Sequence, residues 1–245
     1  QQISIGGLSV GSATDFLGNM DWWGLLTLLV SAASALFCIT IHELSHGLAA
    51  YRLGDPTAKN AGRLSLNPIK HLDLVGLVML VVVKVGWAKP VPVDARYFKR
   101  PRQGMALTAL AGPVSNFVLA LLAVGASSLV WHLAPFSRVT LVALCFGSNV
   151  AILSVGLGLF NLIPISPLDG SKVLYALLPD KAYFTILRYE KYVMGVLILL
   201  TFLGVFQRPL SFLMLHVLQG FCFVTGMPLD WLLAVQDVSA ILNLV

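Results

Sequence analysis

WWGLLTLLVSAASALFCITIHELSH, residues 22–46, is the stretch of sequence that decides the fold. Its first twenty residues contain no charged side chain. An apolar run of about 20 residues is long enough to cross the hydrocarbon core of a membrane as a helix. The run then meets His42, Glu43 and His46. Ionisable side chains are costly at membrane depth and mark functional sites there. The segment therefore predicts a spanning helix that carries a chemical site near one end.

The composition of the whole chain agrees with a membrane location. Of its 245 residues, 58% are hydrophobic and 11% are charged, and the mean hydropathy is +0.86. Ordinary soluble domains carry about 25% charged residues. These values exclude a soluble enzyme, a disordered chain and a typical basic nucleic-acid-binding protein, although the net charge is +5. Because helices satisfy their own backbone inside lipid, the predicted fold class is an all-α polytopic membrane protein.

Four further apolar runs follow the first one and set the expected number of spans. They cover residues 103–137, 139–168, 192–207 and 209–229. We therefore expect a bundle of about five transmembrane helices. Residues 74–83 form an apolar run of only ten residues, which is too short to span a membrane as a helix. We expect this run to form a re-entrant or extended element between the first and second helices.

The basic residues predict how the chain lies in the membrane. Fourteen of the sixteen Lys and Arg residues fall in 51–103 and 171–191. The positive-inside rule places these segments in the cytosol, so we expect a multi-pass protein of the plasma membrane whose site faces the cytosolic side. At a rise of 1.5 Å per helical residue, the two histidines of HELSH lie roughly 9–15 Å below the cytosolic interface.

The HELSH motif has the spacing of a zinc site. His42 and His46 are four residues apart, so both side chains lie on one face of a helix. Two imidazoles on one helical face can hold one metal ion, and Glu43 beside them can act as a general base. With five His and two Glu in the chain, chance matches to this pattern are expected on the order of 10⁻³ times. The motif therefore predicts zinc chemistry.

A catalytic zinc ion usually has three protein ligands, so the motif needs one more. The favoured candidate is Asp169 in NLIPISPLDG, residues 161–170, where two prolines interrupt the end of an apolar run. Broken helices at membrane depth are tolerated around buried sites. Two alternatives remain open at this point. Asp169 could cap a helix over 171–178, or Glu190, in a basic segment, could be the third ligand.

Three motifs together resemble the site-2 protease family of zinc intramembrane metalloproteases. They are HELSH (42–46), AGPVSN (111–116) and NLIPISPLDG (161–170), and the resemblance covers about residues 24–180. The chain resembles a small prokaryotic member of this family, one without PDZ or CBS domains. The resemblance implies a three-span catalytic core, here at 22–51, 104–131 and 139–168.

The resemblance also implies roles for individual residues. It implies that His42, His46 and Asp169 bind one Zn²⁺ ion per chain and that Glu43 is the catalytic base. It implies that Asn116 and Asn161 lie near the active site and contact substrate or an oxyanion. For both asparagines, interhelical hydrogen bonding is the competing explanation, because Asn is common in the interior of helix bundles.

These observations predict a zinc-dependent intramembrane endopeptidase that cleaves peptide bonds within or near transmembrane segments. We expect one membrane-embedded domain over 1–245, with a catalytic core at about 22–180 and accessory helices at about 191–245. The expected partners are a transmembrane protein or peptide substrate and the lipid bilayer, with no nucleic acid. The alternative is a zinc-binding membrane transporter or a non-proteolytic scaffold with a vestigial site. Transporters usually carry ionisable residues on several spans, whereas here they gather at one site.

Overall fold

The computed structural model describes residues 22–73, 76, 88–179 and 192–235, and in these ranges the chain is helical without a β-strand. A set of long helices is apolar enough to cross a membrane: α2 (Trp22–Arg52), α5 (Pro101–Leu133), α6 (Arg138–Asn161) and α9 (Gln207–Thr225). A shorter apolar helix covers Tyr192–Phe202. The predicted all-α polytopic membrane fold is therefore confirmed.

Two apolar runs are helical over less of their length than their composition indicated. The run 139–168 is helical only as far as Asn161, because the prolines that follow cannot continue a helix. The run 192–207 forms the helix Tyr192–Phe202. At 1.5 Å per residue this helix is shorter than a hydrocarbon core of about 30 Å.

The predicted re-entrant or extended element falls on residues 74–83, of which the structure describes only Gly76. This element therefore lies outside the described residues and stays a prediction. The chain that leads into it and out of it is described. Leu72 and Ala88 meet there in an isolated antiparallel bridge, so the two flanks of the element lie side by side.

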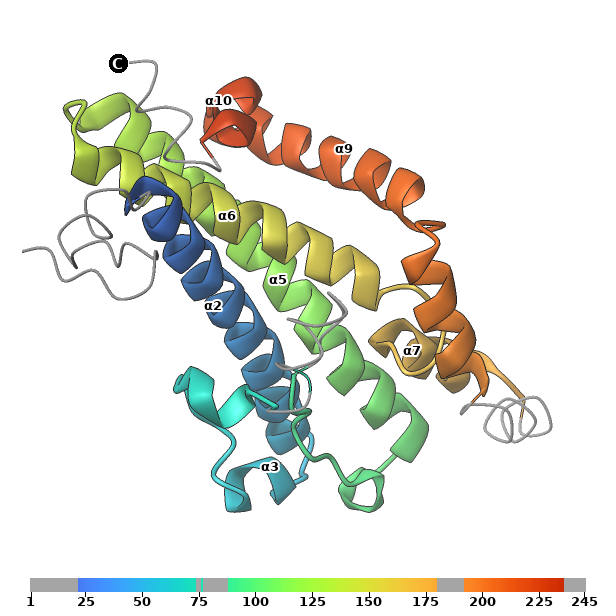
Figure 1. The fold of residues 1–245 in the computed structure, drawn as a ribbon. Helices are drawn as coiled ribbons and strands as arrows, with labels where there is room; N and C mark the ends of the chain where they lie inside the picture. Colours follow the sequence, from blue (N-terminus) through green and yellow to red (C-terminus); the bar gives the residue numbers. More distant parts are fainter. Residues whose placement is uncertain (1–21, 74–75, 77–87, 180–191, 236–245) are drawn as a thin grey trace, which may run out of the picture.

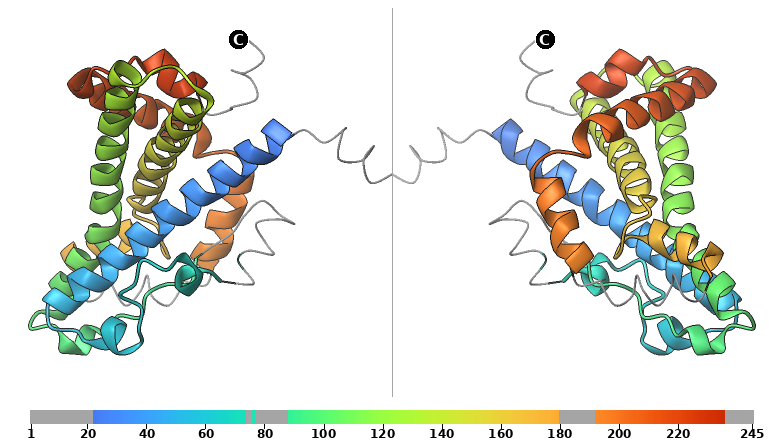
Figure 2. Two further views of the ribbon diagram at one scale, coloured as in Figure 1. Left: turned by 90° about the vertical axis from the view of Figure 1, so that its left-hand side faces the viewer. Right: turned by 90° about the vertical axis from the view of Figure 1, so that its right-hand side faces the viewer.

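Three helices form the centre of the bundle. α5 and α6 lie side by side and are joined by a short turn, and α2 crosses them obliquely (Figures 1 and 2). Small residues let these helices approach closely. On α2, Cys38 is buried and accepts a hydrogen bond from Ser154 of α6 at 3.1 Å. Between α5 and α6, Gly147 packs directly against Ser127. The close approach brings polar groups of different helices within bonding distance of one another.

A second layer covers one side of the α5–α6 pair. α9 and the short helix α10 (Leu229–Ala234) pack against it. Their shared core is a cluster of buried apolar residues: Ala120, Val124, Ala151, Val155, Leu218, Cys222, Met227 and Leu232. The other face of α9 stays exposed and apolar, with Phe223 at 90% exposure. An exposed aromatic face of this kind suits a lipid environment.

The two ends of the bundle differ in chemistry. At the end where α2 finishes and α5 begins lie the short helices α3 (Thr57–Asn60), η1 (Pro68–His71) and η2 (Ala95–Tyr97) (Figure 1). Buried Asp55 links the start of α3 to the residue before η2, because its carboxylate accepts hydrogen bonds from the backbone N–H groups of Thr57 and Asp94. At the opposite end, the tilted rings of Trp131 and Trp231 pack together with centroids 4.4 Å apart. Aromatic residues gather at membrane interfaces.

Candidate metal centre

The two histidines of HELSH lie on one face of α2, as their spacing predicts. Both side chains are buried, and their rings meet edge to face with centroids 4.5 Å apart. The Nε2 atoms of His42 and His46 are 3.0 Å apart. Two nitrogen atoms from adjacent turns therefore point to the same position in the interior of the bundle.

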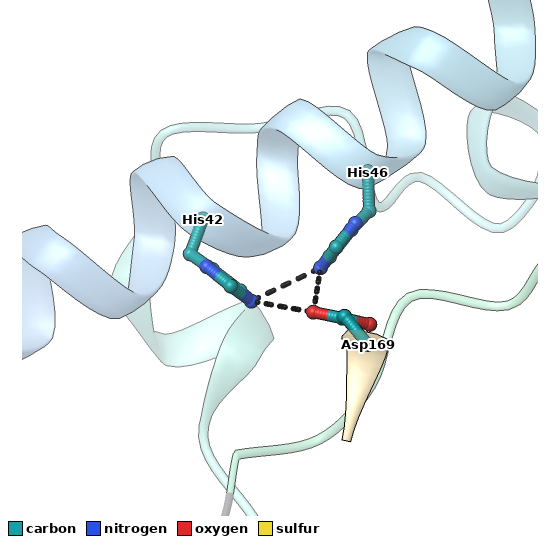
Figure 3. A group of neighbouring side chains, drawn as sticks. All are labelled: His42, His46 and Asp169. Atoms are coloured by element: carbon teal, nitrogen blue, oxygen red, sulfur yellow. Dashed lines mark hydrogen bonds and ion pairs between the residues drawn. The ribbon is translucent and has the colours of Figure 1, made fainter. Parts of the chain in front are cut away.

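Asp169 completes this group from a segment more than one hundred residues further along the chain. Its Oδ2 atom lies 3.2 Å from Nε2 of His42 and 3.0 Å from Nε2 of His46 (Figure 3). One ligand atom from each residue falls within 4.8 Å of the others, and all three residues are buried.

The loop at residues 162–168 and the helix α7 (Asp169–Leu177) place Asp169 in the group. Gly170 lies so close to the carbonyl oxygen of Leu162 that a Cβ atom would clash with it. The loop can therefore fold tightly onto the start of α7 only with glycine at this position. Leu168 is the N-cap residue of α7 and Asp169 is the first residue of the helix, so the alternative in which Asp169 is the N-cap is wrong. The alternative ligand Glu190 lies outside the described residues.

Three residues of α5, each four positions apart, form a stripe that faces the histidines. The backbone carbonyl of Thr108 accepts a hydrogen bond from Nδ1 of His46 at 2.7 Å. Gly112 lies against both imidazole rings, and a Cβ atom there would collide with them. The side-chain amide of Asn116 lies 3.1 Å from Nδ1 of His42. The stripe follows from the helical period, which places residues four apart on one face.

These contacts agree with a metal ion held by the three residues. A carbonyl oxygen only accepts hydrogen bonds, so the bond with Thr108 requires the proton of neutral His46 on Nδ1. The lone pair then lies on Nε2, the atom that faces the other two ligand atoms. A backbone carbonyl behind a metal-binding histidine is a usual outer partner. Two imidazoles and one carboxylate are also a zinc-type donor set.

Glu43 lies next to this group without being part of it. The side chain is half-buried, and its Oε2 atom accepts a hydrogen bond of 2.9 Å from the backbone N–H of Val91. Val91 is itself buried and packs over Gly47, one turn beyond Glu43 on α2. The segment 88–94 therefore lies along α2 beside the candidate base.

Asn161 is the one proposed site residue that the structure does not join to the others. It ends α6, and its side-chain amide donates to the carbonyl of Leu157 in the same helix at 3.0 Å. Among the described residues it makes no hydrogen bond with His42, His46 or Asp169. A contact between Asn161 and a substrate stays a prediction.

Sequence reasoning missed several residues that touch the group. Lys172 donates a hydrogen bond of 3.1 Å to Oδ1 of Asp169, and its spacing of three residues on α7 could have indicated this contact. Gly112 lies inside the AGPVSN motif, so the sequence shows a glycine there but does not show that the glycine makes room for the two imidazole rings. The contribution of Thr108 comes from a backbone carbonyl, for which the side-chain pattern holds no signal.

Fold and site together define a class of protein. This is a polytopic membrane protein whose first described helix carries an HExxH motif at a buried group of two histidines and one carboxylate. The chain belongs to a family of zinc metalloproteases. It is 40% identical over 192 residues to the protein named "Putative zinc metalloprotease YwhC" from Bacillus subtilis (strain 168), and the alignment covers 76% of this chain and 81% of that protein.

More distant relatives carry similar names. The chain is 29% identical over 170 residues to "Putative zinc metalloprotease Rip2" from Mycolicibacterium smegmatis, covering 67% of this chain and 62% of that protein. It is 24% identical over 165 residues to "Zinc metalloprotease MJ0392" from Methanocaldococcus jannaschii, covering 67% of this chain and 38% of that protein. No protein-family model and no solved structure matches the chain. The names of these relatives imply zinc as the metal of the family.

Proposed function

We propose that the protein is an intramembrane zinc endopeptidase of the site-2 protease type, which hydrolyses peptide bonds within or near transmembrane segments. The observation that carries the proposal is the burial of His42, His46 and Asp169 among helices long and apolar enough to span a membrane. A hydrolytic centre in this position acts on chains that are themselves in the membrane. Membership of a family of zinc metalloproteases supports zinc-dependent hydrolysis of peptide bonds as the chemistry.

In this proposal the three buried residues hold one zinc ion per chain. A bound zinc ion supplies a Lewis acid, which polarises a carbonyl group and lowers the pKa of water. His46 is set for this role by the Thr108 carbonyl, which keeps the ring proton on Nδ1. Asp169 presents Oδ2 to the histidines while Lys172 holds Oδ1. His46 and Asp169 are thus each orientated by a second group behind them.

Glu43 is the proposed general base. A base must lie within hydrogen-bond reach of the proton it removes and must be held in place. The N–H of Val91 engages Oε2 and leaves Oε1 to take a proton from the attacking water molecule. Glu43 then passes this proton to the nitrogen of the leaving amine. Its position next to His42 turns its side chain by about 100° around the helix, away from the ligand direction.

The orientation in the membrane is part of the proposal. Basic residues gather where α2 ends and α5 begins, and the tryptophans Trp131 and Trp231 gather at the opposite end. The positive-inside rule supports a cytosolic position for the basic end, and the aromatic end fits the outer interface. His46 lies six residues before Arg52, so we infer that the site is reached from the cytosolic half of the plasma membrane.

The substrate in this proposal is a transmembrane protein or peptide. A helical substrate hides its carbonyl groups in i→i−4 hydrogen bonds, so the helix must unwind before water can attack. We therefore expect cleavage near glycine, proline or polar residues in the substrate. A transporter or a scaffold with a vestigial site remains the alternative, and neither requires a carboxylate orientated beside the metal ligands as Glu43 is.

The test measures zinc and proteolysis on the same purified chain. The wild type in detergent should hold about one zinc ion and should cleave a transmembrane peptide that carries glycine and proline in its middle. Glu43→Gln should keep the zinc ion and lose proteolysis by about 100-fold or more. Turnover near the wild-type rate in this variant would refute the mechanism, and absence of cleavage by the wild type would favour the transporter or scaffold.

A matched pair of variants tests the third ligand. Asp169→Asn should lower zinc content, whereas Glu190→Gln should leave zinc content at the wild-type level. The opposite result would assign the third ligand to Glu190.

A further inference from the structure

Asn116 has surroundings that the proposed function does not yet explain. Its side chain is completely buried on α5, and its amide lies 3.1 Å from Nδ1 of His42. Its Oδ1 atom is buried without a hydrogen-bond partner. An unpartnered acceptor inside a protein costs about 1–3 kcal/mol, and a half-turn of the amide would place this oxygen on His42 instead.

The chemistry of His42 decides which atom of the amide faces the ring. Its Nε2 atom is the one that faces His46 and Asp169, at 3.0 Å and 3.2 Å. A histidine that binds a metal through Nε2 carries its proton on Nδ1 and donates it to an acceptor behind the ring. The Asn116 amide is the polar group that reaches Nδ1 of His42. Only its oxygen can accept this proton.

The oxygen and nitrogen of an amide exchange places by a half-turn of the group, and their assignment follows from the hydrogen bonds they can make. With the nitrogen facing His42, the ring must keep its lone pair on Nδ1 and its proton on Nε2. With the oxygen facing His42, the proton lies on Nδ1 and the lone pair lies on Nε2. The second arrangement is the one that suits a metal ligand.

We propose that Asn116 is a positioning residue, whose side-chain oxygen accepts the Nδ1 proton of His42 and so turns the Nε2 lone pair of that histidine toward the metal. The inference rests on the proposed zinc site and assigns Asn116 a role that acts through His42 rather than through the substrate. It makes α5 the support of both histidines, because Thr108 holds His46 in the same way two stripe positions away.

A second buried asparagine shows what a purely structural role looks like. Asn149 on α6 donates from its side chain to the carbonyl of Cys145 in the same helix at 2.9 Å, and Ser31 of α2 lies 3.4 Å from its Oδ1 atom. It is buried like Asn116, at 9% exposure, but none of the hydrogen bonds described for it reaches the three candidate ligands. Asn149→Leu is therefore the matched control for Asn116→Leu.

The experiment measures the zinc affinity of the full-length chain in detergent by competition with a chelator, and the thermal unfolding of each zinc-free variant. Asn116→Leu should bind zinc about 10–100-fold more weakly than the wild type. Asn116→Asp retains an acceptor for the Nδ1 proton and should restore affinity to within a few-fold. Asn149→Leu should lower the unfolding temperature without changing zinc affinity. If Asn116→Leu does not fold, Asn116→Ala replaces it.

Two results would overturn the inference. One is wild-type zinc affinity in Asn116→Leu or Asn116→Ala. The other is a loss of zinc affinity in Asn116→Asp as large as the loss in Asn116→Leu, which would assign the effect to the amide N–H group instead of the oxygen. Because the readout is zinc affinity, a wild-type chain that binds zinc without cleaving peptides would refute the proposed protease and leave this test in force.

Discussion

Replacing Gly112 by alanine tests how closely α5 packs on the metal centre. An ideal Cβ atom at this position would lie 2.7 Å from Cε1 of His42 and would come closer still to the ring of His46. Carbon atoms in contact are about 3.5–4.0 Å apart at their energy minimum. The rings must therefore retreat by about 1 Å, or α5 must move away by a similar distance.

A displacement of this size acts on the site more than on the fold. Misplacing a reacting group by about 1 Å can lower the rate 10²-fold. We therefore expect Gly112→Ala to reduce proteolysis by about 100-fold and zinc affinity by about 10-fold or more. Crowding of a packed interior costs about 1–3 kcal/mol, whereas alanine in place of glycine favours a helix by about 1 kcal/mol.

Gly220→Ala separates these two contributions. Gly220 lies inside α9, and apart from its chain neighbours and the backbone of its own helix, no atom lies within 4 Å of a Cβ built there. Gly220→Ala should therefore show only the gain in stability from alanine in a helix, with unchanged zinc affinity and turnover. The assays are chelator competition, cleavage of a transmembrane peptide and thermal unfolding of the zinc-free protein. Wild-type zinc affinity together with wild-type turnover in Gly112→Ala would refute the reasoning.

Three further outcomes follow from the same geometry. Asp169→Asn should lower zinc affinity by about 10-fold or more, measured by chelator competition, and wild-type zinc affinity in this variant would remove Asp169 from the ligand set. Gly47→Ala should crowd Leu64 and Val91, because a Cβ would lie 2.6 Å from Cδ2 of Leu64 and 3.2 Å from Cγ1 of Val91. Turnover should therefore fall while zinc affinity holds, and loss of zinc instead would contradict the assignment of the Val91 contact to the base. Single cysteines at Lys59 and Lys99, in a chain without its native cysteines, should both react with an impermeant thiol reagent from the cytosolic side only, and labelling from opposite sides would contradict the proposed topology.

The sequence by itself determined those features that depend on short spacings along the chain. The apolar run before His42 and the low charge content require helices in a membrane, because only such helices hide long apolar runs and satisfy their backbone. The four-residue spacing of His42 and His46 requires one helical face. Both conclusions are local, and the structure agrees with the helices and with the pairing of the two rings.

Other features were only partly accessible from the sequence. The run ending at residue 168 looked like one span, but its helix ends at Asn161 and leaves a loop that carries Asp169 to the histidines. From the sequence, the role of Asp169 as a metal ligand could be favoured over a role as a helix cap only because the HELSH motif needs a third ligand. No spacing rule connects residues 127 positions apart, such as His42 and Asp169, so their meeting had to be read from the structure.

The tertiary structure alone decided which groups stand behind the ligands. The Thr108 carbonyl, the space left by Gly112 and the amide of Asn116 converge on the histidines because α5 crosses α2 at this point. The N–H of Val91 reaches Glu43 because the segment 88–94 folds back along α2. These contacts depend on helix crossing and chain return, which are set by packing across the whole bundle. A backbone carbonyl or a missing side chain leaves no chemical mark in the sequence from which its partner could be inferred.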